Sequence, residues 1–216
     1  MDLSTLTPTE LPSTVSAPSE LWSLERLEGE LVSLWPYAHG YYARDLPYQI
    51  WALIEKDDAA KYIFYEYQEG PEPISIKGDL ATFIAYLSDP QKIILVVEDN
   101  ETKGIAGMIW FDSFIPNYRC HSGFWMRRRF WGHRTREACR IALDYIFNKI
   151  NVQSVWGFTP WQTSLKTQTA LGFTYTCSLP DYVLIDGRPN DMHISYLRKQ
   201  DFVIAANGKN NGVQHG

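Results

Sequence analysis

Two apolar runs in the middle of the chain constrain its fold more than any other feature. Ile93–Val97 is an unbroken run of large aliphatic residues, and a polar turn, residues 99–104, joins it to a second run, Ile105–Phe111. A short continuous run of this kind is typical of a strand buried on both faces, and the turn between the runs predicts a hairpin. A strand buried on both faces belongs in a sheet that helices cover.

The rest of the chain supplies helices and further strands. The apolar spacing predicts helices over Leu46–Lys56, Asp79–Ser88, Gly132–Lys149 and Trp161–Leu171, and strands over His121–Arg127, Val152–Thr159, Tyr182–Ile185 and His193–Leu197. Some of these strands follow one another through turns and others through helices. The chain is therefore expected to form a mixed α/β sheet flanked by helices.

The two ends differ from the middle in composition. Residues 1–20 are rich in Ser, Thr and Pro and predict an extended tail; Ser19 would then cap a helix from Glu20 to Trp35. The leucines of that helix recur every three or four residues: Leu24, Leu27, Leu31 and Leu34. The expected organisation is an N-terminal extension, 1–40, a domain, 41–201, and a Gly/Asn-rich tail, 202–216. The apolar stripe either packs on the domain or lets residues 1–35 dock on a partner protein.

Composition excludes several classes of function. The formal net charge of −5 argues against a nucleic-acid partner. No apolar run reaches the ~18–20 residues of a membrane span, and the Met1 end lacks a secretion-signal pattern, so a cytoplasmic protein without a membrane partner is expected. The three cysteines lie far apart without metal-ligand spacing, which indicates no metal site.

Residues 124–138 carry the clearest chemical signal. A strand ends, a basic loop with one glycine follows, and a long amphipathic helix begins. The first amides of a helix lack intrahelical acceptors and its dipole adds partial positive charge, so the segment predicts an anion site suited to a pyrophosphate. Gly132 would let the phosphate approach the backbone. The basic side chains of the loop and the first helical turn would add charge: Arg129, Arg134 and Arg136.

Several motifs around this segment occur together in one known family. Phe130-Trp131-Gly132 precedes Glu137-Ala138; Ser164 precedes Leu171-Gly172-Phe173; and residues 182–188 read Tyr-Val-Leu-Ile-Asp-Gly-Arg. In this order they resemble the GNAT superfamily of N-acetyltransferases, especially the branch that acetylates ribosomal-protein N-termini. The resemblance extends from about Leu46 to Asp201 and implies a mixed, mostly antiparallel sheet.

The resemblance also implies a cofactor and a reaction. Acetyl-coenzyme A would transfer its acetyl group to an amine, either a protein N-terminus or a small molecule. The residues implied to bind the cofactor are Phe124, Trp125, Met126, Arg129, Gly132, His133, Arg134, Thr135, Arg136 and Ser164.

Three departures from the family pattern keep a second hypothesis open. Arg134 stands where a second Gly or Ala is expected, the loop is one residue shorter, and Trp161 replaces a common Asn and would narrow the cofactor channel. These changes favour the alternative of a catalytically degenerate GNAT fold, acting as a structural or interaction protein in a larger assembly such as a virus particle.

Acetyl transfer to an amine needs a base and an acid near the cofactor. His121, at the start of a strand expected to line the cleft, is the first candidate base because the unperturbed imidazole pKa is about 6.5. Glu98, at the end of a central strand, is a second candidate base. Tyr175 is the candidate acid, because the family often uses a tyrosine in that role.

Overall fold

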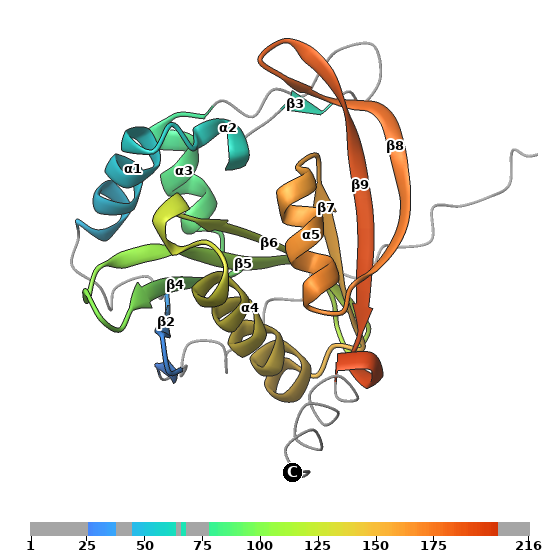
Figure 1. Ribbon diagram of the computed structural model, residues 1–216, viewed down its shortest axis with the longest axis horizontal. Helices are drawn as coiled ribbons and strands as arrows, with labels where there is room; N and C mark the ends of the chain where they lie inside the picture. Colours follow the sequence, from blue (N-terminus) through green and yellow to red (C-terminus); the bar gives the residue numbers. More distant parts are fainter. Residues whose placement is uncertain (1–25, 38–44, 64–65, 68–77, 203–216) are drawn as a thin grey trace, which may run out of the picture.

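One sheet runs through the described residues, 26–37, 45–63, 66–67 and 78–202, of this computed structural model (Figure 1). Its strand order is β1-β2-β4-β5-β6-β7-β9-β8-β3. The strands are β1 (Leu27–Glu28), β2 (Val32–Pro36), β3 (Glu66–Tyr67), β4 (Ile93–Asp99), β5 (Ile105–Ile115), β6 (Arg119–Met126), β7 (Ser154–Thr159), β8 (Thr174–Ile185) and β9 (Arg188–Arg198). Every neighbouring pair is antiparallel except β6 and β7, which are parallel. The predicted mixed, mostly antiparallel sheet is confirmed.

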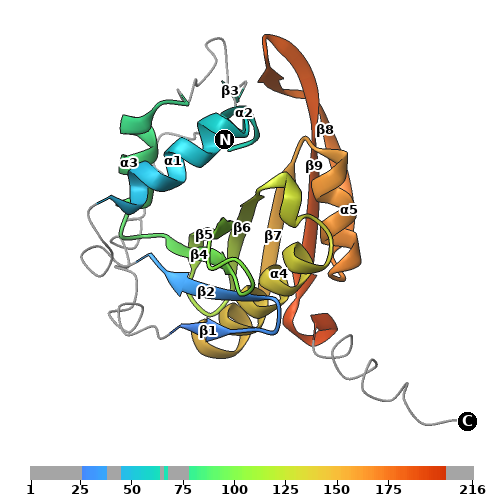
Figure 2. The same cartoon turned by 60° about the vertical axis from the view of Figure 1, so that its left-hand side comes forward.

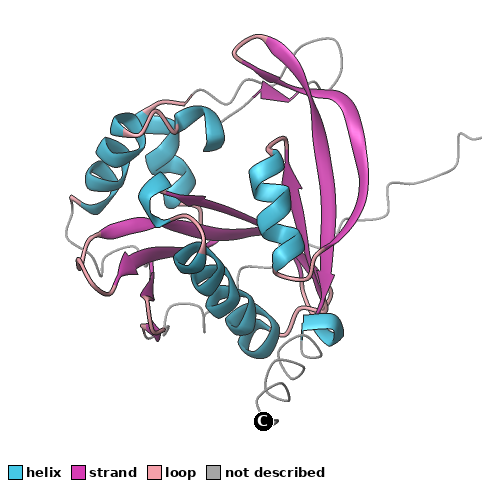
Figure 3. Cartoon of the chain, in the orientation of Figure 1, coloured by secondary structure: helices cyan, strands magenta, loops and turns pink. Residues whose placement is uncertain are grey.

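The helices cover both faces of this sheet (Figure 3). They are α1 (Leu46–Lys56), α2 (Ala60–Ile63), α3 (Leu80–Leu87), the 3₁₀-helix η2 (Arg128–Phe130), α4 (His133–Tyr145), the π-helix η3 (Ile146–Ile150) and α5 (Gln162–Ala170). None of the described helices is both long and apolar enough to cross a bilayer.

Strand β4 is buried on both faces, as its aliphatic run predicts. Leu95 and Val97 pack in one cluster with α4, whereas Ile94 and Val96 pack in a second cluster with α1 and α3. Successive side chains of a strand point to opposite faces, so a run without polar residues fills two cores at once. The sheet is therefore the middle layer between α1 and α3 on one side and α4 on the other.

The predicted helix over Glu20–Trp35 is wrong for the part that the structure describes, and residues 1–25 lie outside it. Residues 27–36 form the hairpin β1–β2, and β2 pairs with β4 at one end of the sheet (Figure 2). Leu27 and Leu34 are cross-strand partners in this hairpin, so a spacing of seven that fits a helix face also fits a hairpin. Glu137 of α4 fixes the turn, because its carboxylate accepts hydrogen bonds from the amides of Glu30 (2.6 Å) and Leu31 (2.9 Å).

The other differences between prediction and structure concern the lengths of elements and two short elements that were not predicted. Helix α4 ends at Tyr145 and continues as the π-helix η3. Strands β8 and β9 extend well beyond the predicted four and five apolar residues, because they pair with each other along their polar segments. Sequence patterns also give no sign of α2 or β3, which are four and two residues long.

A buried carboxylate ties the first turn of α4 to the β4–β5 turn. The side chain of Asp99 is fully buried, accepts hydrogen bonds from the Thr102 amide (2.9 Å) and hydroxyl (2.7 Å), and pairs with Arg134 Nε at 2.5 Å. Burial by itself would raise the pKa of Asp99, but the hydrogen bonds from Thr102 and Arg134 outweigh it, so the pKa lies below its usual value. The folded state therefore favours the charged carboxylate.

We expect Asp99→Asn to lower the free energy of unfolding by about 2 kcal/mol, because charge-assisted hydrogen bonds to a buried group are lost. For a chain of this size that is a fall of roughly 4–8 °C in the melting temperature. Because the folded pKa is lowered, the stabilisation is present above the unfolded value of about 3.9 and is lost as the pH falls through the folded value. Melting curves from pH 2 to 7 measure the difference.

Glu101→Gln is the matched control, because Glu101 pairs with the same arginine (2.7 Å) but is largely exposed. An exposed pair contributes at most about 1 kcal/mol, so Glu101→Gln should change the melting temperature less than Asp99→Asn. Equal losses in the two variants, or a loss from Asp99→Asn that does not shrink as the pH falls, would contradict this account.

Candidate functional site

The two parallel strands of the sheet separate halfway along their length. Cα partners run from Arg119 and Ser154 to Ser122 and Gly157, and there the β6–β7 register ends. Strand β6 continues through Phe124 to Met126, hydrogen-bonded to β5 alone in the strand register. Residues 124–126 therefore present backbone donors and acceptors towards an opening between the strands.

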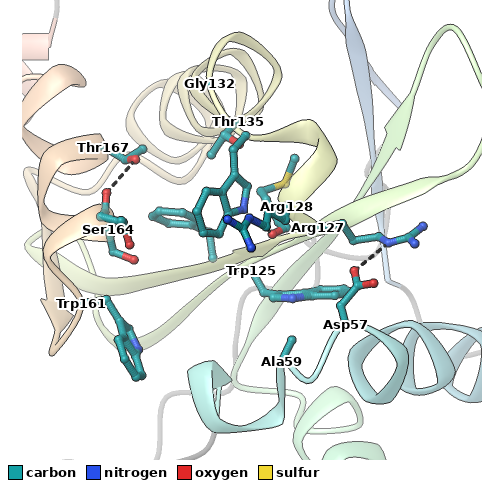
Figure 4. Close-up of a pocket in the computed structure, with 14 residues that line it drawn as sticks. Asp57, Ala59, Trp125, Arg127, Arg128, Gly132, Thr135, Trp161, Ser164 and Thr167 are labelled. Atoms are coloured by element: carbon teal, nitrogen blue, oxygen red, sulfur yellow. Dashed lines mark hydrogen bonds and ion pairs between the residues drawn. The ribbon is translucent and has the colours of Figure 1, made fainter.

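A cavity of about 520 Å³ lies at this free end of β6 (Figure 4). The end of β6, the loop before α4, helix α5 and the α1–α2 connection all contribute to its walls. The lining residues are Asp57, Ala59, Phe124, Trp125, Met126, Arg127, Arg128, Trp131, Gly132, Thr135, Trp161, Thr163, Ser164 and Thr167. Trp161 is the N-cap of α5 and lines the cavity. This is the position that it would need in order to narrow a cofactor channel, as the sequence predicts.

The N-terminus of α4 faces this cavity. Gly132, its N-cap, has φ +94° and ψ −118°, and the first intrahelical bond runs from the Arg136 amide to the Gly132 carbonyl (3.1 Å). The amides of residues 133–135 therefore have no acceptor within the helix. Gly132 and Thr135 line the cavity, and a Cβ added at Gly132 would meet no heavy atom within 4 Å. This arrangement suits a bound anion.

The 3₁₀-turn before α4 is held against the end of β6. The Trp131 indole donates a hydrogen bond to the Met126 carbonyl (2.8 Å), and the Thr135 hydroxyl donates one to the Phe130 carbonyl (3.0 Å). Arg127 Nε pairs with Asp57 at 2.9 Å, which joins the same turn to the end of α1. The loop is therefore fixed from both sides of the sheet.

The arginines of this segment have different positions. Arg128 lines the cavity, whereas the Arg129 guanidinium lies over the Phe130 ring, 4.5 Å from its centroid. Arg134 is directed to Asp99 and Glu101 and is not among the lining residues. Its guanidinium therefore does not fill the space beside Gly132.

The predicted cofactor-binding residues divide into two groups. The structure brings six of them to the cavity wall: Phe124, Trp125, Met126, Gly132, Thr135 and Ser164. Arg129, His133, Arg134 and Arg136 are absent from that wall; His133 and Arg136 instead contact each other, with 3.3 Å between Nδ1 and a guanidinium nitrogen.

His121 lies on β6 just before the strands separate, half-buried against the Phe158 ring at 4.7 Å between centroids. Its Nδ1 is 3.9 Å from an oxygen of Asp112, whose other oxygen is 3.4 Å from the Tyr86 hydroxyl. Burial lowers the pKa of His121 below its usual value; the Arg119 charge adds to the lowering and the Asp112 charge opposes it. The imidazole is therefore biased towards its neutral, proton-accepting form.

The two other catalytic candidates lie on other strands, Glu98 on β4 and Tyr175 on β8. Glu98, on β4, accepts a hydrogen bond from the Arg26 guanidinium (3.1 Å). The Tyr175 hydroxyl contacts the Ser178 hydroxyl (2.9 Å), which in turn contacts His193 Nδ1 (2.7 Å). None of the three catalytic candidates, His121 included, is among the lining residues.

Sequence reasoning missed several residues of the wall. Asp57 and Ala59 come from the α1–α2 connection, almost 70 residues before β6 ends, and no local pattern marks them. Arg127 and Arg128 belong to the basic run 127–129; the run predicted positive charge here but did not show that these two residues line the cavity and Arg129 does not.

Comparison with solved structures shows the class of fold. A ribosomal-protein S5 alanine acetyltransferase from Vibrio fischeri superposes with a TM-score of 0.63 at 16% identity, covering 82% of this chain and 98% of that one. A spermidine N-acetyltransferase from Vibrio cholerae, solved with CoA and spermine, gives 0.62 at 18% identity, covering 80% and 98%. A GCN5-related N-acetyltransferase from Brucella melitensis gives 0.62 at 15% identity, covering 83% and 80%.

The fold is therefore that of the GCN5-related N-acetyltransferases. No protein-family model matches the chain, and no curated protein matches it by sequence.

Proposed function

We propose that this protein is an acetyl-CoA-dependent N-acetyltransferase that acts on an amine. The observation that carries the proposal is the cavity between the free end of β6 and α5, with the N-terminus of α4 at its wall. A fold shared with acetyltransferases agrees with it, although a fold alone does not define an activity.

The residues present fit the cofactor. Gly132 and the free amides at the start of α4 would hold the diphosphate, and Arg128 would add one positive charge. Residues 124–126 of β6 would pair with the amide groups of the pantetheine arm. Acetyl-CoA would supply an acetyl group activated as a thioester.

The chain itself would handle the proton of the acceptor amine. His121 would accept that proton at Nε2, because its Nδ1 faces Asp112. The lowered pKa of His121 keeps the imidazole neutral near pH 7, which is the form that a general base requires. None of the three candidates is among the lining residues; His121 is preferred because it lies on β6 at the last pairs before the strands separate, whereas Glu98 is paired with Arg26 on β4 and Tyr175 lies on β8.

The likeness to solved structures does not select one acceptor. Enzymes named for a ribosomal protein and for spermidine superpose about equally well, so membership of the ribosomal-protein branch remains a proposal. The alternative of a non-catalytic assembly component also remains a hypothesis. Of its supports, a helical docking segment is absent from residues 27–36, and Arg134 does not plug the loop.

Calorimetric titration of the full chain with acetyl-CoA tests the cofactor directly. We expect saturable binding that Arg128→Ala weakens about tenfold, the effect of losing one hydrogen bond between charged groups. Arg129→Ala is the matched control: it removes the same charge one residue away, outside the cavity wall, and should leave the affinity unchanged.

Absence of binding at millimolar acetyl-CoA would refute the proposal and favour the non-catalytic alternative. Equal weakening by Arg128→Ala and Arg129→Ala would contradict the assigned position of the diphosphate.

A further inference from the structure

Four side chains form a continuous surface beside His121, and we name them the arginine–aromatic surface: Arg119, Trp156, Tyr196 and Arg198. Trp156 lies in register between His121 and Tyr196. The Trp156 and Tyr196 ring centroids are 5.5 Å apart with planes inclined by 33°. The Arg119 guanidinium carbon lies 5.9 Å from the Trp156 centroid, and that of Arg198 lies 5.3 Å from the Tyr196 centroid.

The two arginines of this surface are not neutralised. Within the described ranges neither forms an ion pair with a carboxylate, whereas Arg127 and Arg134 do. Arg119 Nε is buried without a hydrogen-bond partner in that part of the chain. A guanidinium stacked on a ring keeps its planar N–H groups available for a carboxylate. The surface is thus locally cationic in a chain with a net charge of −5.

The surface lies on the face of the sheet from which an amine would reach His121. Cys120 packs in the cluster that contains α4, so its neighbour His121 points to the opposite face. Helix α4, whose N-terminus would hold the diphosphate, lies on the Cys120 side. Cofactor and acceptor would therefore approach the opening between β6 and β7 from opposite faces.

The dimensions of the surface match a short extended peptide. Neighbouring strands are about 4.8 Å apart. Tyr196 on β9 is two strands away from His121 on β6, with Trp156 of β7 between them, so the two residues lie roughly 10 Å apart. An extended chain advances about 3.3 Å per residue. A peptide with its N-terminal amine at His121 would therefore place its second to fourth residues along the surface. Arg198 is exposed, and the other three side chains are partly exposed.

We infer that the arginine–aromatic surface recognises the acceptor as an acidic peptide N-terminus, with Asp or Glu within its second to fourth residues. The inference rests on the proposed function, because it takes the peptide amine to be the group acetylated. Arg198 donates a hydrogen bond to the Tyr196 hydroxyl (3.3 Å), but neither arginine has a carboxylate partner among the described residues. Both would therefore attract the carboxylates and repel a polycationic acceptor such as spermine.

Calorimetric titration with peptides tests the inference without relying on turnover. The probes are an acidic peptide, Ala-Glu-Asp-Glu followed by a neutral tail, its amide counterpart, Ala-Gln-Asn-Gln with the same tail, and spermine. The full chain should bind the acidic peptide about tenfold more tightly than the amide peptide, and the difference should shrink as salt rises. Arg198→Gln should reduce the preference, and Arg119→Gln combined with Arg198→Gln should abolish it.

Arg140→Gln is the matched control, because Arg140 is an exposed arginine of α4, the helix on the opposite face. It should keep the full preference, and unfolding curves verify that all variants are folded. Equal affinity for both peptides, tighter binding of spermine, or a preference that survives the double substitution would overturn the inference.

Acetyl-CoA titrations on the same samples separate this inference from the proposed function. If the protein binds and turns over acetyl-CoA but does not prefer the acidic peptide, only the role of the arginine–aromatic surface is refuted. If the protein prefers the acidic peptide but does not bind acetyl-CoA, both the peptide's role as acetyl acceptor and the proposed function are refuted.

Discussion

Gly132→Val is expected to weaken acetyl-CoA binding by at least tenfold, and with it the turnover at fixed cofactor concentration. The φ of +94° and ψ of −118° at this N-cap lie where only glycine is found without strain, and strain of this kind costs about 1–3 kcal/mol. The backbone would relax, moving the free amides of α4 away from the anion, and the new side chain would enter the space where the diphosphate approaches. A binding isotherm for acetyl-CoA measures the loss.

Gly187→Val provides the matched control. Gly187 also has a positive φ, +72°, and a Cβ there likewise meets nothing within 4 Å, but it lies in the β8–β9 turn and not at the cavity. Both variants should lose some stability, and only Gly132→Val should lose cofactor affinity. If the two variants bind acetyl-CoA equally well, the N-terminus of α4 is not the anion site.

The second large effect is expected at His121. His121→Gln should lower kcat by about 10²–10⁴, the range contributed by a positioned general base, and leave the affinity for acetyl-CoA unchanged. Because burial lowers the pKa of His121, the rise of kcat/KM with pH should have its midpoint below pH 6.5, and the variant should lack that rise. Stopped assays that count acetylated product from pH 5 to 9 give both quantities.

Asp112→Asn refines the assignment. The Asp112 charge opposes the lowering of the His121 pKa, so removing it should move the midpoint to a still lower pH while some kcat is retained. A His121→Gln variant with normal kcat would rule out His121 as the base. If kcat/KM of the unchanged protein rises with a midpoint above pH 6.5, burial does not lower the pKa of His121 as described.

The sequence predicted correctly those elements that depend on residues close together in the chain. The β4–β5 hairpin follows from one aliphatic run, a polar turn and a second run; the predicted helix Leu46–Lys56 has the observed bounds of α1. The leucine spacing in residues 24–34 led to the wrong prediction of a helix. A spacing of seven residues does not distinguish one face of a helix from facing positions in a hairpin. Pairing of β2 with β4, about 65 residues away, decided that case.

The candidate site was predictable along β6 and around Gly132, where a strand, a loop and a helix follow one another directly. Its other residues depend on contacts between distant segments. Arg134 looks like a phosphate ligand in sequence, yet Asp99, 35 residues earlier, binds it. The 3₁₀-turn decides that Arg127 and Arg128 of the basic run line the cavity and Arg129 does not, and the packing of α1 brings Asp57 there.

The separation of β6 from β7 has a consequence for how the sheet is built. Beyond Ser122 and Gly157 no ladder sets the distance between the two strands, so packing above and below must set it. On one side that packing is close. The Gln168 amide of α5 lies where a Cβ of Gly157 would stand, and the Gln168 amide oxygen accepts a hydrogen bond from the buried Ser195 hydroxyl at 2.8 Å. The width of the opening is thus a property of helix docking, which side-chain substitutions can adjust without breaking a single backbone hydrogen bond of the sheet.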